Sequence, residues 1–257
     1  MKLSTFFAFA KPQYLWRNRR GFCHVCGHQT LFLLNAPLDL IRNHALCVRC
    51  GSVSRHRHLA RCVLEHFKNR GIGTLRDFGH HPEIQVFNSV SFGCIVKQMG
   101  QHPNIICSEH FDGVAPGDYK NGVLCEDFEK LSFEDDCFDL VLSEDVFEHL
   151  KDFRKGFEET FRILKRNGVH IFSIPFYFSR KTEPLFEFRD GKEIPLGPVE
   201  YHGDPIRGKL PAYNHFGYDL FDLLEKIGFE TRLHISQYED ELKYGTFNCF
   251  TFISQRK

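Results

Sequence analysis

Four cysteines near the start of the chain form two Cys-x-x-Cys pairs, within the stretches CHVCGHQ and CVRCGSV. Cys23 and Cys26 make the first pair, and Cys47 and Cys50 make the second. A glycine follows each pair, and glycine permits the tight turn that directs two sulfurs and nearby backbone N–H groups at one ion. Because four thiolates complete a tetrahedral shell, the spacing predicts a small zinc ribbon with a structural Zn²⁺ ion.

The other six cysteines are scattered along the chain, which suits reduced thiols better than a disulfide framework. No apolar run approaches the roughly 18 residues of a membrane span. The stretch FFAFA at residues 6–10 is too short for the core of a signal peptide. We therefore expect a cytoplasmic protein without a membrane span.

The chain has no net charge, but its charges are unevenly distributed. The first 70 residues hold twelve Lys and Arg against two acidic residues, so the remainder carries the balancing excess of acid. One interpretation is a basic head that docks on an acidic body, and the alternative is an anionic partner. In the helix expected over residues 54–70, the basic run 55–58 would lie on a solvated face or meet a phosphate.

Beyond residue 73, short apolar segments alternate with helical patterns. We expect strands at TLRDF (74–78), NIICSE (104–109), GVLCED (122–127), FDLVLS (138–143) and VHIFSIP (169–175), with helices at IQVFNSV (84–90) and over residues 151–168. A helix at residues 218–229 and two further strands at 230–236 and 246–253 complete the chain. This alternation predicts a doubly wound α/β fold, with a mostly parallel sheet and ligands at the carboxyl ends of its strands.

The central part of the chain resembles a known enzyme family. The run EDFEKLSFEDDCFDLVLSEDVFEHL and the helix and strand that follow it are similar to class I S-adenosylmethionine-dependent methyltransferases of the type 11 group. The resemblance spans roughly residues 73–252, and it implies a Rossmann-like, seven-stranded sheet. The stretches CVRCGSVSRHRHL, YHGDPIRG and HFGYDLFDLLEKIGF are similar to segments of a bacterial subgroup that carries an amino-terminal zinc ribbon.

The resemblance assigns several residues to the cofactor, S-adenosyl-L-methionine. Glu109, at the end of NIICSE, matches the acid that accepts both ribose hydroxyls. Asp127 matches the acid that accepts from the adenine amino group, and Phe128 would line the base. Ser143 and His149 would flank the place where the methyl group is presented.

The stretch FGHHPE occupies the expected place of the family's glycine-rich loop, yet it contains a single glycine. We expect the backbone of Phe78 and Gly79 to approach the methionine part of the cofactor, with His80 or Glu83 supplying a polar contact. The alternative is a loop that has lost the cofactor, which would make the chain a non-catalytic scaffold.

The length of 257 residues allows one α/β domain with a small appendage. We expect a head over residues 1–53, a methyltransferase domain over 54–257, and a substrate lid inserted at about 176–216. His149 and His215 are the predicted bases that take a proton from the acceptor.

The leading hypothesis is methyl transfer to oxygen or nitrogen of a small polar metabolite, such as a sugar of a surface polysaccharide. The rival is an RNA methyltransferase that grips nucleic acid with its basic head.

Overall fold

The computed structural model describes residues 18–34 and 40–257. The chain divides into two compact units. The first unit takes Met1–Ile84, Phe92–Ile105 and Leu233–Phe252, and the second takes Gln85–Ser91, Ile106–Arg232 and Ile253–Lys257. The basic residues 1–17, with the stretch FFAFA, lie outside the described residues. The expected division at residue 53 stays a prediction.

The first unit begins with a small antiparallel sheet. Its strands are β1 (Arg19–Cys23), β2 (His28–Leu33) and β3 (Leu46–Cys47), in the order β1-β2-β3. The Cys-x-x-Cys pairs fall at its turns, where Gly27 and Gly51 adopt φ angles of 70° and 76°. These left-handed conformations favour glycine, as the sequence predicted.

Helix α2 (Ser54–Phe67) follows the sheet and confirms the predicted helix. Leu59, Val63 and Phe67 form its buried stripe. The expectation for the basic first turn is wrong in part, because Arg57 and His58 are 0% exposed and lie neither on a solvated face nor open to a phosphate. The other elements of this unit are η2 (Ile41–Asn43), η3 (Lys68–Arg70), η4 (Leu75–His80), α3 (Cys94–Met99) and α6 (Tyr238–Tyr244).

The second unit is built on a large mixed sheet, with strand order β17-β18-β9-β8-β4-β5-β7-β6. The strands are β4 (Val86–Asn88), β5 (Ile105–Glu109), β6 (Tyr119–Lys120), β7 (Val123–Cys125), β8 (Phe138–Glu144), β9 (Leu164–Ser173), β17 (Phe229–Ile235) and β18 (Phe250–Arg256). The pairs β4–β8, β8–β9 and β5–β7 are parallel, while β6 pairs antiparallel with β7. From β4 the chain builds outward to β7 and then returns to β8 on the other side, which confirms a doubly wound sheet.

The sheet has eight strands instead of seven, because the two-residue β6 is added at one edge. The predicted strands NIICSE, GVLCED and FDLVLS are confirmed as β5, β7 and β8. The predicted helix at 151–168 is confirmed as α4 (Phe153–Ile163), but it ends earlier, where β9 begins. Helix α5 (Leu220–Ile227) confirms the expected carboxyl-terminal helix.

Two expectations near residue 80 are wrong. TLRDF is not a strand, since residues Leu75–His80 form the 3₁₀ helix η4. IQVFNSV is not a helix, since Val86–Asn88 form strand β4, whose three residues are all buried. The first strand of the large sheet is therefore β4, and the turn that leaves it starts at Ser89.

Phenylalanine fills the core of the second unit. The rings of Phe147 and Phe157 stack with centroids 4.1 Å apart, and Phe128 packs on Phe147 at 5.1 Å. Phe87, on β4, contacts Phe128 and Phe138 at 5.8 and 5.6 Å. These rings pack β4 and β8 against α4 and η5 (Phe147–His149), and so fix the strand ends that bear the polar residues below.

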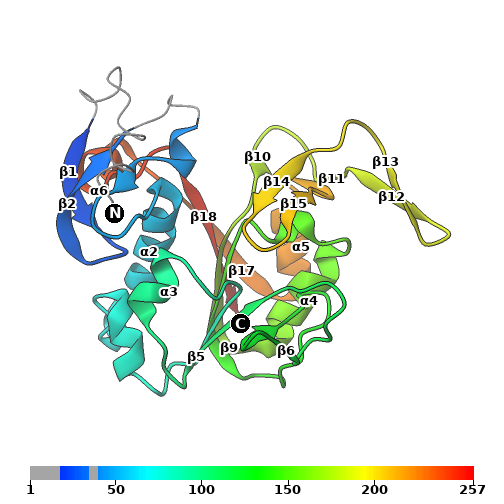
Figure 1. The fold of residues 1–257 in the computed structure, drawn as a ribbon, viewed down its shortest axis with the longest axis horizontal. Helices are drawn as coiled ribbons and strands as arrows, with labels where there is room; N and C mark the ends of the chain where they lie inside the picture. Colours follow the sequence, from blue (N-terminus) through cyan, green and yellow to red (C-terminus); the bar gives the residue numbers. More distant parts are fainter. Residues whose placement is uncertain (1–17, 35–39) are drawn as a thin grey trace. The chain divides into compact units, whose positions relative to one another are not determined.

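The expected insertion at 176–216 consists of short strands, drawn from yellow-green to orange in Figure 1. They are β10 (Phe176–Tyr177), β11 (Glu183–Pro184), β12 (Phe186–Arg189), β13 (Lys192–Pro195), β14 (Tyr201–Asp204), β15 (Gly208–Pro211) and β16 (Asn214–Gly217). They form the sheet β10-β16-β11 and two hairpins, β12–β13 and β14–β15. Among the described residues, no helix is long and apolar enough to cross a membrane.

Candidate active site

Glu109 lies at the carboxyl end of β5, beside the chain that leaves β4. Its Oε1 accepts hydrogen bonds from the backbone N–H and the hydroxyl of Ser91, at 2.7 and 2.9 Å. Glu109 is 9% exposed, and burial raises its pKa above the usual value. A partly buried carboxylate at this switch point of the sheet fits the ribose diol of a nucleoside cofactor.

The other residues predicted to contact the cofactor are buried or hydrogen-bonded within the protein. The Asp127 carboxylate accepts a hydrogen bond from the N–H of Glu129 at 2.9 Å, which holds its own turn. Phe128 is 5% exposed and packs in the aromatic core. Ser143 is 1% exposed and is hydrogen-bonded to Nε2 of His170 at 2.8 Å. Their contact with a cofactor stays a prediction.

The predicted loop residues Phe78, Gly79, His80 and Glu83 belong to the first unit. Phe78 is 0% exposed, and a Cβ added to Gly79 would meet the ring of His102 at 2.2 Å. These residues precede β4 and do not follow a strand of the large sheet, and their contact with the cofactor stays a prediction. The turn with the expected position is the one that contains Ser91.

The segment after β8 brings together a carboxylate and two imidazoles. Glu148 is 0% exposed, and its Oε1 lies 3.5 Å from Nδ1 of His202 and 3.9 Å from Nε2 of His149. The two histidine nitrogens are 3.2 Å apart. Asp145, at the end of β8, has a left-handed backbone with φ of 52°, a strained conformation that is common at functional sites.

The protonation of this cluster follows from its surroundings. Burial raises the pKa of Glu148 to about 7 and lowers the pKa of His149. The carboxylates of Glu148 and Glu200 raise the pKa of His202 to about 9. His149 is therefore neutral at pH 7, whereas His202 carries a proton that a cation could displace.

A second carboxylate, Glu200, connects His202 to His215, one of the two predicted catalytic histidines. Glu200 accepts from Nε2 of His202 at 3.1 Å and from Nε2 of His215 at 2.9 Å. These bonds hold the pKa of Glu200 below its usual value, so it is ionised at neutral pH. Glu148, His149, His202, Glu200 and His215 thus form one continuous polar chain. His149 and His215 were predicted, whereas Glu148 and Glu200 were missed.

The turn after β14 holds two charged residues, Asp204 and Arg207. The Asp204 carboxylate accepts from the N–H groups of Ile206 and Arg207. Burial raises the pKa of Glu109 and lowers that of His149, and the positive charge of Arg207 opposes the first shift and adds to the second. The inserted segment therefore places one cation, Arg207, within electrostatic reach of Glu109 and of the histidine cluster.

Comparison with known proteins gives one match to a protein family. Residues 104–172, from β5 to β9, match the family described as "Methyltransferase domain". This match of residues 104–172 supports activity as a methyltransferase, as the sequence predicted. A comparison of the sequence with curated proteins found no match.

The methyltransferase is also similar to several solved structures. One is CalS10, an amino pentose methyltransferase from Micromonospora echinaspora, with 13% identity, a TM-score of 0.48, and coverage of 81% of this chain and 94% of the other. Another is an S-adenosylmethionine-dependent methyltransferase from Mesorhizobium loti, with 14% identity, a TM-score of 0.41, and coverage of 68% and 91%. A third, from Clostridium acetobutylicum, has 13% identity, a TM-score of 0.42, and coverage of 77% and 98%.

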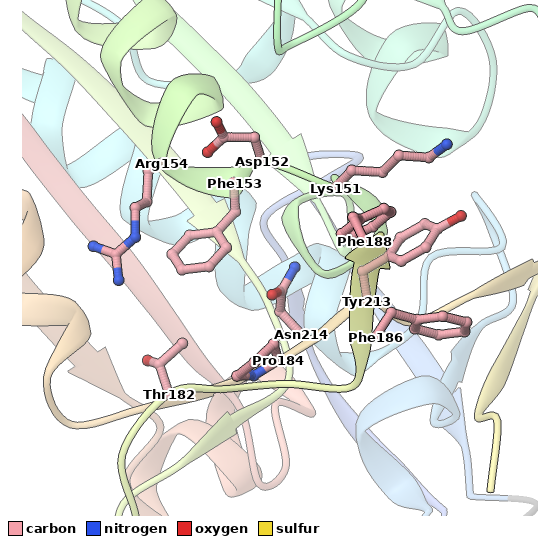
Figure 2. A pocket seen from close by; sticks show the side chains of 10 residues that line it. All are labelled: Lys151, Asp152, Phe153, Arg154, Thr182, Pro184, Phe186, Phe188, Tyr213 and Asn214. Carbon is pink, nitrogen blue, oxygen red and sulfur yellow. The ribbon is translucent and has the colours of Figure 1, made fainter. Parts of the chain in front are cut away.

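A hollow of about 260 Å³ opens beside the start of α4 (Figure 2). It is lined by Lys151, Asp152, Phe153, Arg154, Thr182, Pro184, Phe186, Phe188, Tyr213 and Asn214. The rings of Phe186 and Phe188 lie 4.9 and 5.9 Å from that of Tyr213, and the ammonium of Lys151 lies over the Tyr213 ring at 5.9 Å. None of the residues predicted for cofactor or catalysis, all of which are described, lines this hollow.

In the first unit, the four predicted zinc ligands converge. The sulfurs of Cys23, Cys26, Cys47 and Cys50 lie within 4.8 Å of one another. The sulfurs of Cys23 and Cys50 are 3.8 Å apart, far beyond the length of a disulfide at about 2.05 Å. Two thiolates on a tetrahedral zinc ion, at about 2.3 Å each, are about 3.8 Å apart. The donor set therefore fits the ion that the sequence predicted.

Arg57 is the buried cation next to these cysteines. Its guanidinium donates to the carbonyl oxygens of Ser52, Ala45 and Tyr244, at 2.7, 2.7 and 3.1 Å. Burial lowers the pKa of Arg57, and negative charge on Cys23 and Cys47 opposes that effect. Arg57 thus acts within the fold of the first unit, where its buried guanidinium is not available to contact nucleic acid.

Proposed function

We propose that this methyltransferase transfers a methyl group to an oxygen or nitrogen atom of a small polar metabolite, such as a sugar. The observation that carries the proposal is the polar chain from Glu148 to His215, which the inserted segment folds over the end of β8. Glu109 and Ser91 supply the cofactor side of the same unit. The buried state of Arg57 and His58 speaks against the rival RNA substrate.

The chain's own residues would position the acceptor and take its proton. S-adenosylmethionine, when bound, supplies a methyl group on a positively charged sulfur, so the protein needs no nucleophilic side chain of its own. His215 donates from Nε2 to ionised Glu200, which leaves the lone pair of the neutral ring on Nδ1. Within the described chain, Nδ1 of His215 is buried without a hydrogen-bond partner. The pair therefore resembles a carboxylate-oriented general base for the acceptor proton.

The test combines cofactor binding with turnover. Calorimetric titration should show that S-adenosylmethionine and S-adenosylhomocysteine each bind one site per chain. With a panel of sugars and amino sugars as acceptors, His215→Asn should reduce kcat by about 10²-fold or more while the cofactor affinity stays unchanged. Absence of cofactor binding would make the chain a scaffold, and transfer to RNA but to no sugar would support the rival.

We also propose one structural Zn²⁺ ion on Cys23, Cys26, Cys47 and Cys50, supported by the spacing of their sulfurs. None of the ten cysteines, all of which lie in the described part of the chain, forms a disulfide, and this supports a reducing, cytoplasmic location.

A further inference from the structure

Glu148 is a buried acid whose oxygens are not satisfied by the protein. The side chain is 0% exposed, and neither Oε1 nor Oε2 has a hydrogen-bond partner among residues 18–34 and 40–257. The nearest polar atoms, on His202 and His149, lie 3.5 and 3.9 Å from Oε1, at ion-pair distances. Burying a carboxylate whose oxygens accept no hydrogen bond costs several kcal/mol, and protonated His202 offsets its charge without bonding to it, so a cation that the oxygens can ligate would stabilise it.

The two histidines present their lone pairs to the same point. Nδ1 of His149 must donate to the carbonyl of Pro211 at 2.7 Å, since a carbonyl only accepts, so the neutral ring carries its lone pair on Nε2. Nε2 of His202 donates to Glu200, so a neutral His202 carries its lone pair on Nδ1. These two atoms face each other at 3.2 Å, and two lone pairs at that distance repel unless a cation lies with them.

A proton and a metal ion satisfy this cluster to different degrees. A proton on Nδ1 of His202 bridges to His149, but it leaves Glu148 without a hydrogen bond. A metal ion with ligands at about 2.1 Å holds neighbouring ligand atoms about 3.0–3.4 Å apart, and it satisfies all three groups. The observed separations of 3.2, 3.5 and 3.9 Å need only a small contraction to reach that geometry.

We propose that Glu148, His149 and His202 bind a divalent transition-metal ion. The far nitrogen of each imidazole is held by an oxygen, on Pro211 for His149 and on Glu200 for His202. This is the arrangement that orients metal-bound histidines in proteins. The site is distinct from the four cysteines, because all three ligands belong to the second unit.

The donor set defines the class of ion. Two imidazole nitrogens and one carboxylate oxygen suit Mn²⁺, Fe²⁺, Co²⁺ or Zn²⁺, and three ligands leave open positions for an exogenous molecule. Resting on the proposed function, the ion would bind an acceptor hydroxyl and lower its pKa, so that the oxygen loses its proton to His215 more readily. The metal site itself does not depend on that role.

Titration with Mn²⁺ tests the site directly, because thiolates prefer softer ions and the cysteine site will already hold zinc. Electron paramagnetic resonance of unbound Mn²⁺ should show one equivalent bound per wild-type chain. Glu148→Gln and His202→Asn should each weaken binding at least about tenfold. The matched control is His215→Asn, which shares Glu200 but offers no ligand, and it should keep the wild-type affinity.

Zinc counting provides the second measurement. After dialysis against Zn²⁺, the wild type should hold one more ion per chain than His202→Asn. This variant is preferred to Glu148→Gln because the side chain of His202 is half-buried whereas that of Glu148 is fully buried, so the substitution disturbs folding less. Thermal melting checks that each variant is folded. Equal uptake of both Mn²⁺ and Zn²⁺ by wild type and His202→Asn would overturn the site. Neither measurement needs a methyl acceptor, so failure here leaves methyl transfer untouched.

Discussion

The carboxylate of Glu109 combines burial with a position at the end of a central strand. Glu109→Ala should weaken S-adenosylmethionine binding by about 1–3 kcal/mol, since it leaves buried ribose hydroxyls without acceptors. Calorimetry measures the change, and Glu230→Ala is the control, because Glu230 pairs with Lys257 on the surface at 3.1 Å. Equal cofactor affinity in Glu109→Ala and wild type would place the ribose elsewhere.

His170 should make the second unit sensitive to acid. Complete burial lowers the pKa of His170 to about 3, while an unfolded histidine titrates near 6.5. Between these values the unfolded chain binds more protons than the folded chain. The stability that neutral His170 contributes is therefore fully present above pH 6.5 and is lost as the pH falls toward 3.

Substitution of His170 by a group that does not titrate should remove this dependence. From pH 7.5 to pH 5.0, the free energy of unfolding should fall by about 2 kcal/mol more in the wild type than in His170→Gln. Urea unfolding at both pH values gives the comparison, and the other titrating groups cancel because both proteins share them. Parallel pH profiles would show that His170 is protonated within the fold.

Single residues differ in how far the sequence reveals them. Glu109 could be assigned because its place at the end of an apolar strand is visible in the sequence. Glu148 could not, because it resembles any surface glutamate until the chain folds over it and Tyr213 N–H donates to its carbonyl at 2.7 Å. Burial from a distant segment creates the acid's chemistry, and local patterns do not contain that information.

At the scale of elements, a hairpin builds the histidine cluster. In β14–β15, Tyr201 pairs with Pro211, so His202 and the Pro211 carbonyl reach His149 together. The sequence predicted an inserted segment with His202 and His215 in it, but not these strands. Pairing across 62 residues depends on tertiary packing, which local propensity does not report.

The misplaced first strand also has a local cause. Thr74 and Asp77 form a capping box, and Asp77 accepts from the N–H groups of Gly73 and Thr74 at 2.9 and 2.7 Å. This motif starts a helical turn and overrides the apolar pattern of TLRDF. Val86–Asn88 is a short, fully buried strand, and periodicity cannot distinguish such a segment from a buried helix.

The two candidate cofactor turns make opposite predictions. Ser91→Ala removes one of the two bonds that orient Glu109 and should weaken S-adenosylmethionine binding by about 1 kcal/mol. Glu83→Ala should leave it unchanged, since Glu83 is a surface residue that pairs with His81. Calorimetric titration of both variants decides between the turns, and the reverse outcome would restore FGHHPE as the cofactor loop.

For the whole molecule, the two units depend on different forces. The second unit has a large sheet and an aromatic core, whereas the sheet β1-β2-β3 is small and gathers four thiols. Arg57 links that sheet to the chain near Tyr244 through its hydrogen bonds. The negative charge of nearby thiolates reduces the free-energy cost of burying the Arg57 guanidinium. We therefore expect loss of the metal or of a cysteine to destabilise the structure around Arg57 as well.

Loss of the zinc ligand in Cys47→Ser should therefore unfold the head and spare the sheet of the second unit. The variant should lose its zinc ion, because ribbon folding is coupled to metal binding, and Arg57 would then be buried without the thiolate charge that favours it. Hydrogen exchange should show faster exchange of the β1 and β2 amides, with the β8 and β9 amides as protected as in the wild type. Cys137→Ser is the matched control, since Cys137 lies in the second unit outside the cluster, and it should keep both the zinc and the exchange pattern. Wild-type protection of β1 and β2 in zinc-free Cys47→Ser would show that Arg57 and apolar packing hold the head without a metal.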